Sequence, residues 1–126
     1  MQQYSVYGSR MALQQSVVYG RIHFLRELGN VDTRVRKPIV RNMTAGQMEA
    51  FAEVVHYVVR GSIPALTRDV SIFREKMYVL RQIADRGISL RRNRNSLLAN
   101  HALIPRLLRP YYLDSALYLS IRAFEQ

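Results

Sequence analysis

The sequence contains no cysteine and no tryptophan among its 126 residues. The lack of thiols excludes a disulfide-stapled scaffold, a zinc finger built on thiolates and a cysteine nucleophile. No apolar run approaches the ~18 residues that a membrane-spanning helix needs. The first ten residues are polar and contain two tyrosines, which does not fit a secretory signal peptide. We therefore expect no transmembrane segment and no export by a signal peptide.

Recognisable catalytic motifs are also missing. The six glycines never cluster, so neither a dinucleotide-binding loop nor a P-loop is present. No nucleophile elbow of the form G-x-S-x-G occurs. The histidines His23, His56 and His101 are far apart, and the pair of Glu49 or Glu53 with His56 lacks the second copy that a di-metal bundle requires. We expect a protein that is not an enzyme and that uses no cofactor, metal or small-molecule substrate.

Carboxylates are scarce relative to cations. Nine Asp and Glu face 19 Lys and Arg, which gives a formal net charge of +10, and 17 of the cations are arginine. Arginine grips phosphate oxygens bidentately and stays charged at any working pH. A coding bias toward arginine would give the same composition with scattered positions. The placement of the arginines therefore decides between the two interpretations.

Two segments carry cations and no acid. The first is 33–43, with Arg34, Arg36, Lys37 and Arg41. The second is 86–113, with Arg86, Arg91, Arg92, Arg94, Arg106 and Arg109. Such segments create a local positive potential that attracts polyanions and speeds their association. This potential would attract nucleic acid, an acidic protein partner or an anionic membrane surface equally well.

The hydrophobic periodicity predicts an all-α fold in one domain covering 1–126. Apolar residues recur at helical spacing over 9–28, 44–60, 67–86 and 114–124, and a short basic helix follows Ser89. We expect a small bundle built on a helical hairpin over 44–86, followed by a basic segment and a C-terminal helix over 87–126. Residues 31–43 lack a helical period and contain Pro38, which predicts an extended basic arm.

Capping residues mark three of these helix starts. Thr44 and Gln47 have the spacing of a capping box, in which each side chain bonds the backbone of the other residue. Ser89 is a favourable N-cap for the basic helix, and Asp114 is expected to cap the last one.

The strongest candidate site is the basic helix that starts after Ser89. At about 100° per residue, Arg91, Arg94 and Asn95 fall on one face, with Arg92 on its flank. Arginine and asparagine suit phosphate oxygens and base edges. If residues 67–98 formed a helix-turn-helix, this basic helix would be the recognition helix that contacts the bases. An exposed basic helix that pairs with acids of a partner chain fits equally well.

The C-terminal region supplies an apolar candidate surface. It consists of Leu103, Ile104, Leu107, Leu108, Tyr111, Tyr112, Leu117 and Phe124. Aromatic and aliphatic residues of this kind anchor protein interfaces. If they are exposed, the protein is a structural or adaptor subunit that docks onto other chains of a capsid or other large assembly.

The stretch 54–113 has a recognisable order of short motifs. An apolar helix is followed by Gly61-Ser62-Ile63-Pro64, then by the basic Ser89 to Arg94, and then by Ile104-Pro105-x-Leu107-Leu108-x-Pro110. This pattern resembles small basic helical proteins of polinton-like and adintovirus-like elements, and it is loosely similar to the adenovirus core peptide. The resemblance covers about half the chain. Asn100-His101-Ala102 stands where those proteins have paired glycines. The resemblance implies a virion-associated protein close to DNA, located in a virion or in the nucleus or cytoplasm of a host cell.

The leading hypothesis is a non-enzymatic accessory or packaging protein that binds nucleic acid through phosphate contacts. DNA is the first candidate and RNA the alternative. The expected contacts are Arg34, Arg36, Lys37, Arg41, Arg86, Arg91, Arg92, Arg94, Asn95, Arg106 and Arg109. The alternative hypothesis is the structural subunit that docks through its apolar C-terminal segment.

Overall fold

A computed structural model of the chain describes residues 15–125, and every regular element in that range is a helix. The helices are α2 (Val17–Gly20), α3 (Ile22–Asn30), α4 (Thr33–Arg41), α5 (Ala45–Val59), α6 (Thr67–Glu75), α7 (Met77–Ala84), α8 (Leu90–Ala99), α9 (Leu103–Leu107) and α10 (Pro110–Glu125). The prediction of an all-α fold is confirmed.

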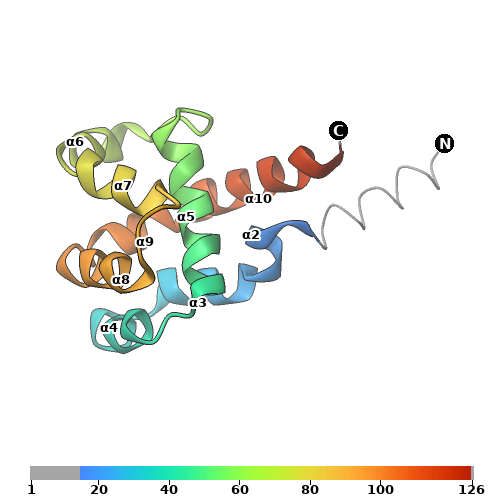
Figure 1. The fold of residues 1–126 in the computed structure, drawn as a ribbon. Coiled ribbons are helices and arrows are strands. Elements are labelled where there is room, and N and C mark those ends of the chain that lie inside the picture. The colour runs from blue at the N-terminus through green and yellow to red at the C-terminus, as the bar shows by residue number, and fades with distance from the viewer. Residues whose placement is uncertain (1–14, 126) are drawn as a thin grey trace.

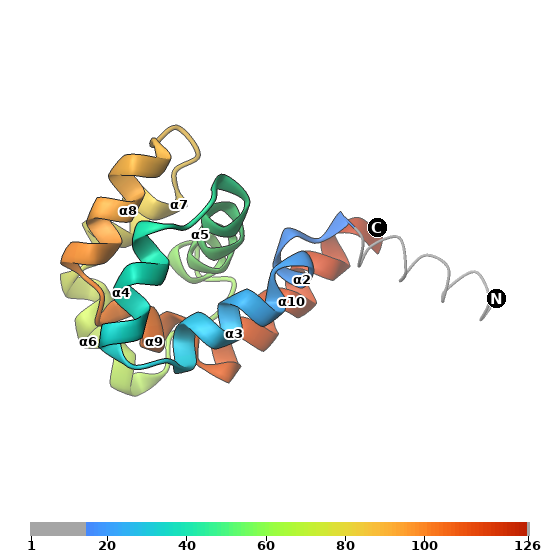
Figure 2. The same cartoon turned by 90° about the horizontal axis from the view of Figure 1, so that it is seen from below.

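Helix α5 lies at the centre of the molecule (Figure 1). It contributes seven buried residues to the core, and its most extensive contact is with α7. It also contacts α2 and α10, and α3 packs on α9. In both views α2 lies beside the C-terminal part of α10 (Figures 1 and 2). One hydrophobic core therefore joins the first described helices to the last.

The predicted ends of α5 are confirmed. The Thr44 hydroxyl accepts from the Gln47 amide at 3.2 Å, and the Gln47 side chain accepts from the Thr44 amide at 3.0 Å. This is the predicted capping box. After α5 the chain turns at Gly61, whose φ of 81° lies in the left-handed region that favours glycine.

The predicted helix over 9–28 is interrupted. Its residues 9–14 lie outside the described residues, and the remainder divides at Arg21 into α2 and α3. Helix α3 ends at Asn30, two residues beyond the predicted helix end at residue 28. A Cβ atom on Gly29 would lie 2.8 Å from the Leu108 Cβ, so glycine allows α3 to pack closely on α9.

The prediction of an extended arm over 31–43 is wrong, because most of this segment forms α4. The Asp32 carboxylate caps the helix by accepting from the Val35 amide at 3.2 Å. Pro38 lies inside α4, where it forfeits one backbone hydrogen bond. The burial of Arg36 and Val40 against the rest of the fold outweighs that loss.

Two other boundaries differ from expectation. The predicted helix over 67–86 bends at Lys76 and becomes α6 and α7. The last helix begins at Pro110 and not after Asp114, because proline is favoured in the first helical position, where its missing N–H has no intrahelical partner. Asp114 lies within α10 and is exposed.

Candidate nucleic-acid interface

Helices α4 and α8 pack against each other on one side of the molecule (Figures 1 and 2). Together they carry seven arginine and lysine residues and no Asp or Glu. Apart from Arg36, which is buried, and Arg94, whose guanidinium bonds a backbone carbonyl, these cations are exposed or half-buried, as is Asn95: Arg34, Lys37, Arg41, Arg91 and Arg92. We call these six residues the α4–α8 basic surface. The fold thus places side by side two acid-free segments that lie about 50 residues apart in the sequence.

Local capping fixes the two helices of this surface. Asp32 caps α4, and the Ser89 hydroxyl caps α8 by accepting from the Arg92 amide at 3.2 Å, as predicted. Each cap satisfies one of the amides that the first helical turn leaves without a backbone partner.

Arg94 joins the two helices. Its guanidinium donates to the Met43 carbonyl through Nε at 2.9 Å and also through Nη2. Met43 is fully buried in the connection between α4 and α5. Arg94 therefore holds α8 in place beside α4, and its donors are used inside the protein.

Arg36 is not on the surface, and the prediction that it contacts phosphate is corrected. Its side chain is buried within the fold, where Nε donates to the Leu28 carbonyl at 3.0 Å and Nη2 donates to the Val31 carbonyl. Burial lowers the pKa of Arg36, while the nearby Asp32 carboxylate opposes this shift. Both accepting carbonyls belong to the turn between α3 and α4, which Arg36 stabilises.

Arg106 and Arg109, two of the predicted phosphate contacts, share a buried carboxylate, and their side chains remain partly exposed. Asp69 of α6 is fully buried and accepts from Arg106 at 3.0 Å and from Arg109 at 3.4 Å. The Tyr112 hydroxyl donates to the second Asp69 oxygen at 2.6 Å and accepts from the Leu66 amide at 2.9 Å. We call Asp69, Arg106, Arg109 and Tyr112 the Asp69 cluster.

Sequence reasoning missed the Asp69 cluster. The only signal is the three-residue spacing of Arg106, Arg109 and Tyr112, which places them near one another along the chain. Nothing local links them to a carboxylate about 40 residues earlier. Burial and the bond to Asp69 raise the pKa of Tyr112 to about 12.

A hollow of about 390 Å³ lies where α4 meets α9, beside the α4–α8 basic surface. Its lining includes Arg36, His101, Arg106 and Arg109. His101 Nδ1 and Arg109 Nε are buried there, and neither has a hydrogen-bond partner within residues 15–125. The two nearby carboxylates, Asp69 beside Arg106 and Arg109 and Asp32 beside Arg36, are fewer than the three guanidinium groups, so this hollow extends the positive potential of the surface.

Arg86 lies apart from the α4–α8 basic surface. It is highly exposed and sits 3.6 Å from a carboxylate oxygen of Glu53 on α5. An ion pair this exposed contributes little to stability.

The apolar C-terminal residues are mostly inside the molecule, so the expectation of an exposed docking segment is wrong for most of them. Leu103, Ile104, Leu107, Leu108 and Tyr112 are buried in the core, and Leu117 is half-buried. Among the predicted partner-binding residues, Tyr111 and Phe124 are exposed. The packing of α9 beneath α3 explains the burial.

The described residues contain no group of three or more His, Asp or Glu side chains placed to hold a metal ion. Within residues 15–125, no helix is both long and apolar enough to cross a membrane. No protein-family model, no curated protein and no solved structure matches the chain.

Proposed function

We propose that this protein binds nucleic acid through the α4–α8 basic surface, mainly by phosphate contacts and without catalysis. Duplex DNA is the first candidate ligand. An accessory or packaging role, within a virion as the motif resemblance implies, follows from such binding because phosphate contacts carry no base sequence information.

The observation that carries the proposal is the pairing of two acid-free helices. Most cations on a protein surface have acids nearby, which neutralise the field at a distance. Here α4 and α8 each lack an acid, and the helices contact one another. The guanidinium groups of Arg34, Arg91 and Arg92 are exposed, so they are available to phosphate oxygens.

The salt dependence of binding follows from the number of free cations. Five cations lie on the α4–α8 basic surface. If each neutralises one phosphate of duplex DNA, the plot of log affinity against log salt concentration has a slope of about −4.5, at roughly −0.9 per phosphate. Arg36 and Arg94 do not add to this slope, because their donors bond backbone carbonyls.

The test compares two triple variants of equal charge. One replaces Arg34, Arg91 and Arg92 by Gln on the basic surface. The other replaces Arg68, Arg74 and Arg81, which are exposed on α6 and α7. Binding to a short fluorescent DNA duplex is measured across a salt series. We expect the first variant to reduce the slope by about 2.7, and the control to change it by less than about 1.

Equal slopes for the two variants would show that net charge, and not the α4–α8 basic surface, governs binding. If the wild-type chain failed to bind DNA or RNA at low salt but bound poly-glutamate, the surface would serve an acidic protein partner. That result would overturn the proposed function.

A further inference from the structure

The hollow of about 390 Å³ where α4 meets α9 has an unusual lining. Of the described residues that line it, three are arginines and none is Asp or Glu. Arg36 comes from α4, Arg106 from α9, and Arg109 from the connection between α9 and α10. The volume lies within the range of about 300–1,000 Å³ that is typical of small-molecule pockets. A concave site lined by guanidinium groups suits an anion.

Arg106 and Arg109 lie next to each other at this hollow, because both bond the same Oδ1 atom of Asp69, at 3.0 and 3.4 Å. Asp69 is fully buried, whereas the side chains of Arg106 and Arg109 are 38% and 27% exposed. A guanidinium group has five N–H donors, and the bond to Asp69 uses one donor of each residue. Asp69 therefore fixes the two groups in place, and their exposed donors remain for an acceptor in the hollow.

Arg36 supplies positive charge to the hollow without a direct bond to a ligand. It is 6% exposed, and its donors bond the carbonyls of Leu28 and Val31. The nearby carboxylates of Asp69 and Asp32 offset two of the three guanidinium charges. The hollow thus keeps a net positive charge of the sign that an oxyanion requires.

The uncharged residues of the lining indicate what the anion is attached to. Thr33 is exposed at the first position of α4 and provides a hydroxyl donor. Ala102 and Pro105 provide apolar contact, which suits the carbon atoms of a sugar. Lys37 of the α4–α8 basic surface follows Thr33 by four positions, so these two side chains are neighbours on α4. The hollow therefore adjoins the basic surface.

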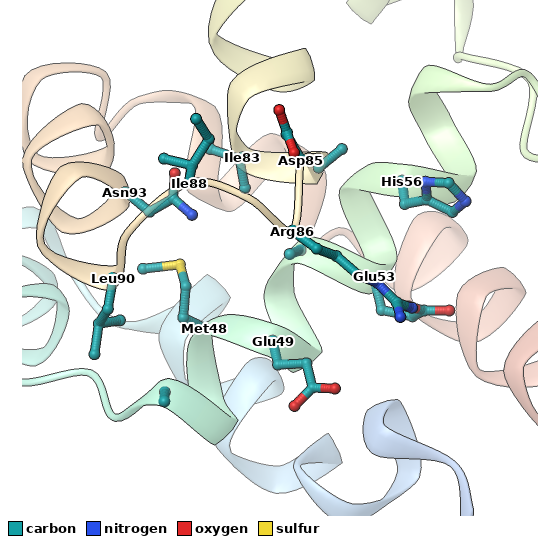
Figure 3. A pocket seen from close by; sticks show the side chains of 13 residues that line it. Met48, Glu49, Glu53, His56, Ile83, Asp85, Arg86, Ile88, Leu90 and Asn93 are labelled. Atoms are coloured by element: carbon teal, nitrogen blue, oxygen red, sulfur yellow. The ribbon is translucent and has the colours of Figure 1, made fainter.

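The groove between α5 and the connection that joins α7 to α8 has the opposite charge (Figure 3). Glu49, Glu53 and Asp85 line it, and the one Arg or Lys among its lining residues is Arg86. An oxyanion would meet repulsion there. The two concave sites thus differ in the sign of the ligand that they favour.

We propose that the α4–α9 hollow binds the terminal phosphate monoester of a nucleic-acid strand that lies on the α4–α8 basic surface, an inference that rests on the proposed function. A phosphate monoester carries a charge of about −1.5 to −2 at pH 7 and has three acceptor oxygens, whereas a phosphate within a strand carries one charge. Arg106 and Arg109 bond the terminal oxygens, and Thr33 contacts the terminal nucleotide from the α4 side. A concave site also favours a strand end over a continuous strand, which would have to bend into it and out again.

The binding test uses the full chain and four DNA hairpins, each with a fluorescent label in its loop and with one 5′ and one 3′ end. The first hairpin has no terminal phosphate, the second has a 5′-phosphate and the third has a 3′-phosphate. The fourth is a charge control, which has no terminal phosphate but is one base pair longer and so gains internal phosphates. We expect a phosphorylated hairpin to bind about tenfold more tightly than the charge control, the scale of hydrogen bonds from partly exposed charged groups.

Variants test whether this preference for a terminal phosphate comes from the hollow. Arg106→Gln should reduce the preference to less than about twofold. Arg74→Gln removes the same charge from an exposed position on α6 and should leave the preference unchanged. Thr33→Val should weaken the preference about threefold, and the fold should persist because Asp32 still caps α4. Arg34→Gln, on the basic surface, should weaken all four hairpins by a similar factor.

The outcomes separate this inference from the proposed function. If no hairpin bound, both would be overturned. If the phosphorylated hairpins bound no more tightly than the charge control, this inference alone would be overturned. A preference that survived both Arg106→Gln and Thr33→Val would also overturn it, and Thr33→Val decides the matter if Arg106→Gln loses its helical circular dichroism.

Inorganic phosphate, titrated at constant ionic strength, distinguishes a strand end from the free anion. We expect it to remove the preference only far above the concentration of the hairpin, because the free ion lacks the sugar and the rest of the strand. If it removed the preference at the hairpin concentration, the hollow would be a site for free phosphate, and the assignment to a strand end would be wrong.

Discussion

The α4–α8 basic surface and the Asp69 cluster both depend on arginine, yet they use it in opposite ways. On the surface, Arg34, Arg91 and Arg92 face water and have no acid in their own helices. In the cluster, Arg106 and Arg109 bond one fully buried carboxylate. The arginines of the acid-free segment 86–113 therefore divide between an exposed helix face and a buried ion-pair cluster. The position of a single distant Asp decides which role each takes.

The largest expected effect comes from removing the carboxylate at the centre of the cluster. Asp69→Ala leaves Arg106, Arg109 and the Tyr112 hydroxyl without their shared acceptor. Breaking a buried charge pair from one side costs about 3–5 kcal/mol. Urea denaturation followed by circular dichroism measures the free energy of unfolding. A loss below about 1 kcal/mol would show that the cluster does not stabilise the fold.

Alkaline pH provides a second test of the cluster. The pKa of Tyr112 is raised to about 12 in the folded protein, against about 10 in the unfolded chain. The folded state thus holds the phenolic proton more tightly. Its stabilising contribution, roughly 2–3 kcal/mol, is complete below about pH 10 and is lost as the pH rises toward 12.

The measurement is urea denaturation at a series of pH values between 9 and about 11.5. Tyr112→Phe should remove most of the pH dependence. Tyr78→Phe is the matched control, since Tyr78 is largely exposed. A pH dependence that persists in Tyr112→Phe would assign it to another group.

A pair of variants on α4 compares the two uses of arginine within one helix. Arg36→Gln should cost about 1–3 kcal/mol, because the Leu28 and Val31 carbonyls lose their donors. Arg34→Gln should change stability by less than about 0.5 kcal/mol. DNA binding should respond in reverse order: the salt slope falls by about 0.9 for Arg34→Gln and stays constant for Arg36→Gln. If both variants changed both quantities, the division of roles would be wrong.

The smallest effect is expected on α8. Arg91→Gln and Arg92→Gln should leave the free energy of unfolding within about 0.5 kcal/mol of wild type. Any change should be a slight gain at low salt, because neighbouring cations repel one another, and it should disappear at about 1 M salt through screening. Thermal denaturation at the two salt concentrations tests this. A clear loss of stability would place these side chains in the structural group with Arg94.

Local signals account for the parts of the fold that the sequence predicts correctly. The capping box at Thr44 and the N-cap at Ser89 each depend on residues within a few positions. The helical period of α5 likewise follows from its own apolar residues. Such features can be predicted without knowledge of any tertiary contact.

The sequence predictions that proved wrong concern features that depend on contacts between residues far apart in the chain. Pro38 suggested an extended arm, but the buried side chains of α4 override that preference. The inward roles of Arg36 and Arg94 require backbone carbonyls that lie 8 and 51 positions away. For the same reason, the burial of Leu107 and Leu108 could not be predicted from an apolar pattern that suits a docking surface equally well. A single sequence gives the type of each side chain but not the distant residue that it contacts in the fold.

The contact between Ser16 and Ser120 has a consequence for how the chain is made. Their hydroxyl oxygens lie 2.5 Å apart although 104 positions separate them, and α2 rests on α10 while α3 rests on α9. A ribosome releases α2 and α3 long before their partners exist. Their apolar sides therefore stay uncovered until α9 and α10 have been synthesised, an interval in which a nascent chain is prone to aggregate.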